Sequence, residues 1–122
     1  MIYKEAIQDA IKMHDLPAEW SPELLKEADL IASKTKKTRY RKDLTNLPFA
    51  TIDGADAKDF DDAIYCQKNS NGFSLYVAIA DVSFYVEVGS KLDKEALKRG
   101  TSIYFPGTVV PMLPERLSND VC

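Results

Sequence analysis

The hydrophobic and polar positions follow a helical period over the first third of the chain. Residues that recur at steps of three and four form one stripe along a helix; they are Tyr3, Ile7, Ala10, Ile11 and His14. This helix is predicted to end at Leu16-Pro17, because the residue before a proline is disfavoured in helical geometry. A second helix is predicted from Ser21-Pro22-Glu23, which supplies a serine N-cap, a proline at the first helical position and an acid in the first turn. Residues 2–34 therefore indicate a helical hairpin with residues 16–20 as its connection.

A polar and basic run follows the second predicted helix. Its cations are Lys34, Lys36, Lys37, Arg39, Arg41 and Lys42. Such a density of positive charge could displace counterions from a nucleic acid, which makes Lys36, Lys37, Arg39 and Arg41 candidate contacts to nucleic-acid phosphates. A charge run is more often a solvated linker, and the residues alone favour that interpretation. Residues 1–46 are thus expected to be a helical lead-in with a basic linker.

Beyond residue 47 the pattern changes to the period of a strand. Two extended runs, 63–66 and 73–82, flank the Asn-Gly turn signal at 69–72 and predict a β-hairpin, with another short extended run at 49–52. The second strand is apolar on both faces, which predicts a central strand covered on both sides. A short helix over 92–98, stopped by Gly100, and a strand over 101–105 complete an α+β unit spanning residues 47–122.

Composition narrows the class of protein. The chain is 45% apolar and 29% charged with a net charge of −3, which is ordinary for a soluble globular protein. It has no apolar run long enough for a membrane span and no visible secretory signal. Its two cysteines, Cys66 and Cys122, are too far apart for a paired-thiol metal motif. We therefore expect a soluble protein of the cytoplasm that does not bind a membrane.

A cluster of acids lies between the strand signals. Its members are Asp53, Asp56, Asp59, Asp61 and Asp62. Two carboxylates about 5 Å apart repel by roughly 3 kcal/mol at an effective dielectric near 20, so a fold that gathers several must neutralise them. Oxygen-only ligands suit a hard divalent cation such as magnesium.

Three other interpretations remain open from spacing alone. Aspartates often form solvated turns, and an acidic patch can bind a protein. A calcium loop is disfavoured, because the positions that should hold ligands and glycine in an EF-hand are Ala55, Ala57 and Lys58.

The acidic segment also carries a resemblance. Thr51-Ile52-Asp53-Gly54 and Asp59-Phe60-Asp61-Asp62-Ala63 resemble the catalytic signature of the ribonuclease II/ribonuclease R family, in its RNB domain. The similarity continues through residues 77–83, 92–93, 99–106 and 111–119. Residues 1–46 look like the segment that precedes the RNB domain in ribonuclease R. The resemblance implies that residues 47–122 are the first part of a mixed α/β catalytic domain.

The resemblance also implies an activity and a site. Family enzymes are processive, hydrolytic 3′-to-5′ exoribonucleases that use magnesium, one or two ions, and release nucleoside 5′-monophosphates from single-stranded RNA. Their four aspartates fall on Asp53, Asp59, Asp61 and Asp62 as metal ligands, with Asp61 the one most tied to the chemical step. Tyr104 falls on the tyrosine that stacks near the 3′ end of RNA, although a buried strand aromatic remains an alternative.

Family enzymes are several times longer than this chain. They carry an arginine and a glutamate late in the catalytic domain, and the resemblance assigns neither to a residue here. We therefore expect a fragment of a longer enzyme, slow or inactive alone. The alternative is a non-catalytic RNA-binding or assembly module derived from an RNB domain. Partners among RNA-decay or ribosome-associated proteins are left open.

Overall fold

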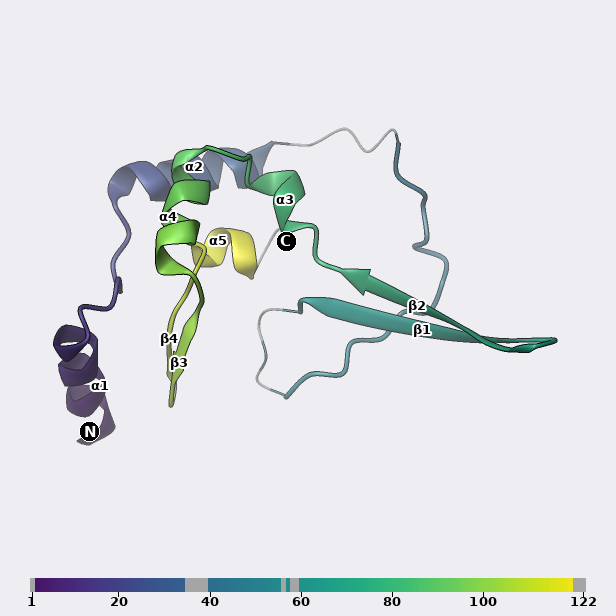
Figure 1. The fold of residues 1–122 in the computed structure, drawn as a ribbon, viewed down its shortest axis with the longest axis horizontal. Helices are drawn as coiled ribbons and strands as arrows, with labels where there is room; N and C mark the ends of the chain where they lie inside the picture. The colour runs from purple at the N-terminus through teal and green to yellow at the C-terminus, as the bar shows by residue number, and fades with distance from the viewer. Residues whose placement is uncertain (1, 35–39, 56, 58–59, 120–122) are drawn as a thin grey trace.

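The computed structural model describes residues 2–34, 40–55, 57 and 60–119 (Figure 1). The elements run in the order α1 (Ile2–Met13), α2 (Pro22–Ser33), β1 (Asp62–Asn69), β2 (Gly72–Ile79), α3 (Val82–Tyr85), α4 (Lys91–Arg99), β3 (Ile103–Phe105), β4 (Thr108–Val110) and α5 (Glu115–Ser118). Helices and antiparallel strands together confirm the predicted α+β class.

Local sequence signals mark the start of α2 and both ends of α4, whereas α1 ends at Met13, before the predicted stop at Leu16-Pro17. Ser21 caps α2 by accepting a hydrogen bond from the backbone N–H of Leu24 at 3.4 Å. Ser90 caps α4 by accepting from the N–H of Asp93 at 3.1 Å, and α4 ends at Gly100, whose φ of 75° suits glycine. In the described part of the chain, no helix has the length and apolar character needed to cross a membrane.

Helices α2, α4 and α5 pack around one hydrophobic cluster. Ala28 of α2, Leu92 of α4 and Leu117 of α5 are fully buried in it. Leu24 of α2, Val86 after α3 and Leu113 before α5 complete the cluster. These side chains come from segments up to ninety residues apart, so the cluster ties the beginning of the chain to its later elements.

Helix α1 packs elsewhere. Ile7 and Ile11 are buried against Val110 of β4, with Ile103 and Phe105 of β3 partly buried beside them. The two N-terminal helices lie where the sequence predicts, but their apolar faces belong to two different clusters rather than to each other. The stripes identify the faces that are buried, and segments between about sixty and a hundred residues later supply most of their partners.

Arg99, the last residue of α4, joins the connection between α1 and α2 to the later part of the chain. Its side chain is 1% exposed and donates hydrogen bonds of 2.6 to 3.1 Å. The acceptors are the carboxylate of Glu95 and the backbone oxygens of Pro17, Glu19 and Pro111. The guanidinium also lies 3.4 Å from the centre of the Trp20 ring, a cation–π contact.

The strands form two separate antiparallel pairs. In the first, Asp62 of β1 lies opposite Ile79 of β2, and the register runs to the pair Asn69 and Gly72 at the turn. This is the hairpin that the Asn-Gly signal predicts. In the second, β3 pairs with β4. An isolated bridge from Ala50 to β1 lies within the run predicted to be extended at 49–52.

The prediction that the second strand of the hairpin is covered on both sides is wrong for the described chain. Strand β2 has β1 as its hydrogen-bonded neighbour, and the hairpin projects away from α2, α4 and α5 (Figure 1). The side chains of Leu75, Val77 and Ile79 are 56% to 66% exposed. An apolar pattern shows that side chains favour burial, but it does not supply the element that covers them. The described helices use their apolar faces in the two clusters, neither of which includes a residue of β2.

Candidate functional site

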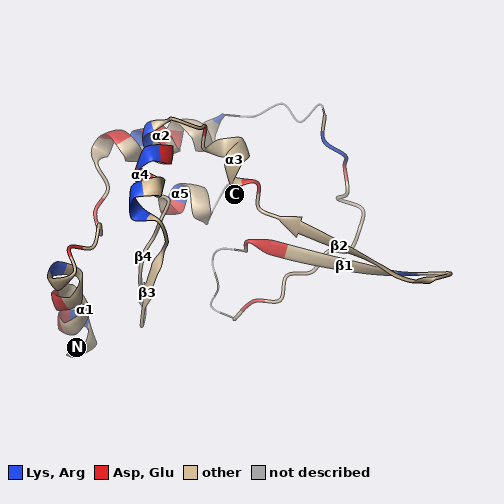
Figure 2. Cartoon of the chain, viewed as in Figure 1, with Lys and Arg blue, Asp and Glu red and all other residues tan. Residues whose placement is uncertain are grey.

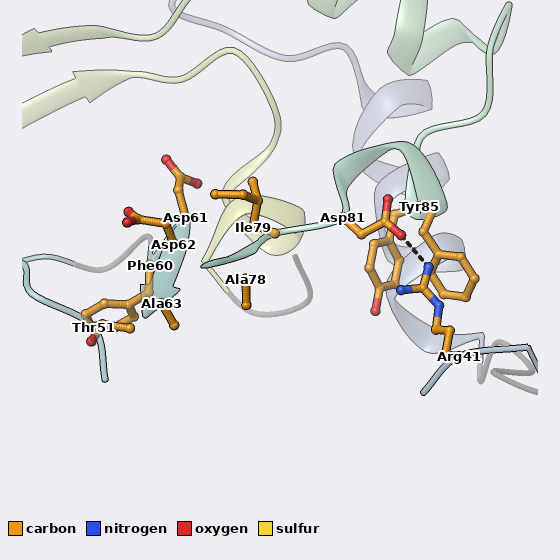
Figure 3. A pocket seen from close by; sticks show the side chains of 12 residues that line it. Arg41, Thr51, Phe60, Asp61, Asp62, Ala63, Ala78, Ile79, Asp81 and Tyr85 are labelled. Carbon is orange, nitrogen blue, oxygen red and sulfur yellow. Dashed lines mark hydrogen bonds and ion pairs between the residues drawn. The ribbon is translucent and has the colours of Figure 1, made fainter. Parts of the chain in front are cut away.

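A cavity of about 390 Å³ lies at the open end of the β1–β2 hairpin (Figure 3). The hairpin ends and the residues next to them supply most of its lining, and Arg41, Thr51 and α3 supply the rest. The lining residues with functional groups are Arg41, Thr51, Asp61, Asp62, Asp81 and Tyr85. The cavity therefore combines acidic and basic side chains from segments forty residues apart.

Asp61 and Asp62 form the acidic side of the cavity. The carbonyl of Asp61 accepts a hydrogen bond from the N–H of Ala80 at 2.7 Å, and Asp62 begins β1 opposite Ile79. The antiparallel ladder thus fixes the backbone of both residues, while both side chains stay exposed. Figure 2 shows this acidic end of β1 in red.

The four predicted metal ligands are only partly placed by the structure. Asp53 is exposed on the segment before β1, and Asp59 lies outside the described residues. Among the residues that the structure describes, no three carboxylate, histidine or cysteine side chains are grouped closely enough to hold a metal ion. The structure therefore brings Asp61 and Asp62 to one cavity, and the four-aspartate site stays a prediction.

The chemistry of these two side chains still suits magnesium. They provide hard oxygen donors and no nitrogen or sulfur. Magnesium is commonly held by one or two carboxylates together with the phosphates of a substrate, rather than by a closed protein cage. Asp61 and Asp62 could thus hold such an ion if a nucleotide phosphate completed its coordination.

Arg41 forms the basic side of the cavity. Its Nη2 donates a hydrogen bond to Oδ2 of Asp81, and its guanidinium lies 4.2 Å from the centre of the Phe84 ring. Oδ1 of Asp81 accepts a hydrogen bond from Oγ of Ser83 at 2.9 Å. The hydrogen bond from Arg41 is the main reason that the pKa of Asp81 lies below its usual value, and the bond from Ser83 lowers it further.

The other predicted RNA contacts differ in what the structure says of them. Lys36, Lys37 and Arg39 lie outside the described residues. Tyr104 is in the middle of β3, opposite Val109, and is 66% exposed rather than buried. The alternative of a buried strand aromatic is therefore wrong, and the stacking role remains a prediction.

Sequence reasoning did not find the partners of Arg41. Asp81 and Ser83 lie in a segment with family resemblance, but the resemblance implies no role for either. Arg41 and Asp81 are forty residues apart, so no local period or spacing connects them. Only the register of the hairpin, which sets Ala80 beside Asp61, brings this segment to the cavity.

Comparison with known proteins gives one consistent result. The RNB domain profile matches residues 41–122. Ribonuclease R of Escherichia coli is 49% identical over 121 residues, which are 96% of this chain and 15% of that protein. Ribonuclease R of Thermotoga maritima is 52% identical over 121 residues, 95% of this chain and 17% of that protein.

Solved structures agree. Mycoplasma genitalium RNase R in complex with double-stranded RNA superposes with a TM-score of 0.87 at 41% identity, over 96% of this chain and 21% of that one. The same enzyme in complex with ribose methylated single-stranded RNA gives a TM-score of 0.86 over 96% of this chain and 19% of that one. The chain thus spans between 14% and 27% of the curated relatives it matches.

Proposed function

The chain belongs to the RNB domain family, and on that premise we propose that it forms the metal-binding part of an exoribonuclease. The proposed enzyme degrades single-stranded RNA processively from the 3′ end and releases nucleoside 5′-monophosphates by magnesium-dependent hydrolysis. Curated relatives named ribonuclease R support the exoribonuclease, and solved relatives in complex with double-stranded and with single-stranded RNA support RNA as the substrate. The direction, the metal and the products rest on the resemblance of the aspartate motif.

One observation carries the proposal: Asp61, Asp62 and Arg41 line the same cavity. Carboxylates beside a guanidinium fit a phosphodiester that is bridged to a divalent cation. The acids would hold the cation, and the guanidinium would hold a phosphate, which planar arginine forks bind well. A solvated acidic turn would not require a cation on the opposite side of a shared cavity.

The residues divide the work of hydrolysis. A bound magnesium ion would supply an activated water and neutralise charge that develops on the phosphate. Asp61 and Asp62 would hold that ion, with Asp53 and Asp59 as the other proposed ligands. The bond from Ala80 to the carbonyl of Asp61 restrains the main chain that carries the acids. Tyr104 would stack on a base, a contact that tolerates any sequence.

The first prediction tests the catalytic assignment. In the full-length protein encoded by the gene that carries this sequence, Asp61→Asn removes the negative charge with little change in shape. We expect the rate of RNA hydrolysis to fall at least about a hundredfold while RNA binding is retained, because a ligand of the ion is lost. Release of 5′-mononucleotides from a labelled oligonucleotide measures the rate.

Asp29→Asn is the matched control, because Asp29 is an exposed acid of α2 that does not line the cavity. We expect this variant to keep the rate of the unsubstituted enzyme. RNA decay that continues unchanged in Asp61→Asn would overturn the catalytic assignment and favour a non-catalytic RNA-binding or assembly module.

The second prediction concerns the 122-residue chain by itself. We expect it to hydrolyse RNA slowly or not at all, because the late arginine and glutamate implied by the family resemblance are not assigned to any of its residues. Robust magnesium-dependent release of 5′-mononucleotides by the purified chain would contradict this expectation.

A further inference from the structure

Arg41 is restrained in two directions. Its Nη2 donates a hydrogen bond to the carboxylate of Asp81, and the central carbon of its guanidinium lies over the Phe84 ring, 4.2 Å from the ring centre. A surface arginine usually samples many rotamers, and holding one rotamer costs conformational entropy. Two contacts on one guanidinium reduce the entropy that would be lost when a ligand binds to it.

Asp81 is itself held in place. Its second carboxylate oxygen accepts a hydrogen bond from Oγ of Ser83, so one oxygen faces the serine and the other faces Arg41. The backbone carbonyl of Asp81 also accepts from the N–H of Phe84 at 3.0 Å. The segment from Asp81 to Phe84 therefore supplies the carboxylate, the hydroxyl and the ring that together fix the arginine.

This arrangement leaves hydrogen-bonding capacity on Arg41. A guanidinium carries five N–H groups. Within the described part of the chain, Nη2 is the atom of Arg41 that donates a hydrogen bond, so Nε and Nη1 can serve a ligand. A phosphate accepts two parallel hydrogen bonds from such a fork.

The position relative to the acids is fixed by the hairpin. Asp81 directly follows Ala80, whose N–H is bonded to the carbonyl of Asp61. In Figure 3 Asp61 and Asp62 lie at one end of the cavity, Arg41 and Asp81 lie at the other, and Ala78 and Ile79 lie between them. A strand of RNA that follows this cavity would meet both the acids and Arg41.

We propose that Arg41, Asp81, Ser83 and Phe84 form a phosphate-binding subsite for the RNA backbone, in which Arg41 contacts a phosphate beside the cleaved bond and Asp81 is a positioning residue for Arg41. This inference rests on the proposed function. It assigns to Asp81 a role in binding rather than in chemistry, and it distinguishes Arg41 from the remainder of the basic run.

The test measures RNA binding by the full-length protein as a function of salt. The probe is a 5′-labelled single-stranded oligonucleotide in EDTA, and its fluorescence anisotropy gives Kd between 50 and 300 mM KCl, a range in which counterion effects are large (about tenfold or more). Arg41→Gln is expected to raise Kd about tenfold and to reduce the slope of log K against log salt by about 0.7, the contribution of one phosphate contact on a single strand.

Asp81→Asn and Arg41→Lys should behave differently. Asp81→Asn keeps the charge of Arg41 but removes the carboxylate that restrains it, and Arg41→Lys keeps a positive charge but removes the planar guanidinium. For both variants we expect Kd to rise about fivefold while the salt slope stays unchanged. The matched control is the exposed pair of Lys91 and Glu23, joined at 2.7 Å and not part of the cavity lining. Lys91→Gln and Glu23→Gln should leave both Kd and slope unchanged, and thermal unfolding shows whether each variant is folded.

Two results would overturn the inference. An unchanged slope in folded Arg41→Gln would show that Arg41 contacts no phosphate. Tighter binding, or an unchanged Kd, in Asp81→Asn would show that the aspartate neutralises or merely neighbours the arginine instead of positioning it. If either result is found while the unsubstituted enzyme hydrolyses RNA in magnesium, the phosphate subsite is wrong and the proposed function stands. If the unsubstituted enzyme hydrolyses no RNA, the proposed function itself is wrong.

Discussion

At the scale of single residues, the side chain of Arg99 donates hydrogen bonds to four acceptors. Three of its four acceptors are backbone carbonyls. These carbonyls satisfy the buried guanidinium, so Glu95 is its one charged acceptor within the described ranges. The geometry requires a planar fork, because one nitrogen, Nη1, serves two carbonyls while Nη2 and Nε serve others. Lysine has a point charge and cannot reproduce these directions.

We predict that Arg99→Lys lowers the free energy of unfolding by about 2 kcal/mol, because the partly buried carbonyls of Pro17 and Pro111 lose their donor. Urea denaturation of the 122-residue chain, followed by circular dichroism, measures the change. The neighbouring Lys98→Ala is the control, since Lys98 is exposed, and it should shift stability by less than about 0.5 kcal/mol. A matching small shift for Arg99→Lys would show that the fork is unimportant.

At the scale of elements, α4 contains two leucines in contrasting surroundings. Leu92 is fully buried between α2 and α5, and Leu97 is 83% exposed on the same helix. The helix itself is stabilised by its serine cap and by its terminal glycine. A leucine-to-alanine substitution at each position therefore changes helix propensity equally, but only the substitution at Leu92 leaves an internal cavity.

We expect Leu92→Ala to reduce the free energy of unfolding by about 3 kcal/mol, through lost burial and the cavity left behind. Leu97→Ala removes the same atoms from an exposed site and should change it by less than about 0.5 kcal/mol. Thermal and chemical unfolding of both variants give the comparison. Equal effects would mean that the cluster around α4 does not pack as described.

Element boundaries were predictable from sequence where local chemistry determines them. Ser21 with Pro22 marks the start of α2, Gly100 marks the end of α4, and the Asn-Gly turn fixes the first hairpin. The packing partners of the helices could not be predicted from sequence, because α1 packs against β3 and β4, which lie almost a hundred residues later in the chain. The site shows the same division: the motif identified Asp61 and Asp62, whereas the pair of Arg41 and Asp81 depends on tertiary structure.

At the scale of the whole molecule, the first hairpin presents one face of apolar side chains to solvent. Phe73, Leu75, Val77 and Ile79 alternate along β2 and are each more than half exposed. On the partner strand Ile64 lies opposite Val77 and extends this face. Contiguous exposed apolar surface of this kind promotes association.

We predict that the 122-residue chain self-associates as its concentration rises and that Val77→Lys suppresses this, because a charge in the centre of the face opposes its burial. Light scattering across a concentration series measures the association. Val88→Lys is the control: Val88 is 96% exposed but lies outside the hairpin, so association should persist. A chain that stays monomeric throughout the series would refute the prediction.

The contacts of Arg99 also set an order of events during synthesis. The carbonyl of Pro17 emerges from the ribosome 82 residues ahead of the guanidinium that binds it. At 5 to 20 residues per second, that interval lasts about 4 to 16 s. During that interval the carbonyl of Pro17 lacks its Arg99 donor, so the α1–α2 connection gains this contact only after α4 has been translated.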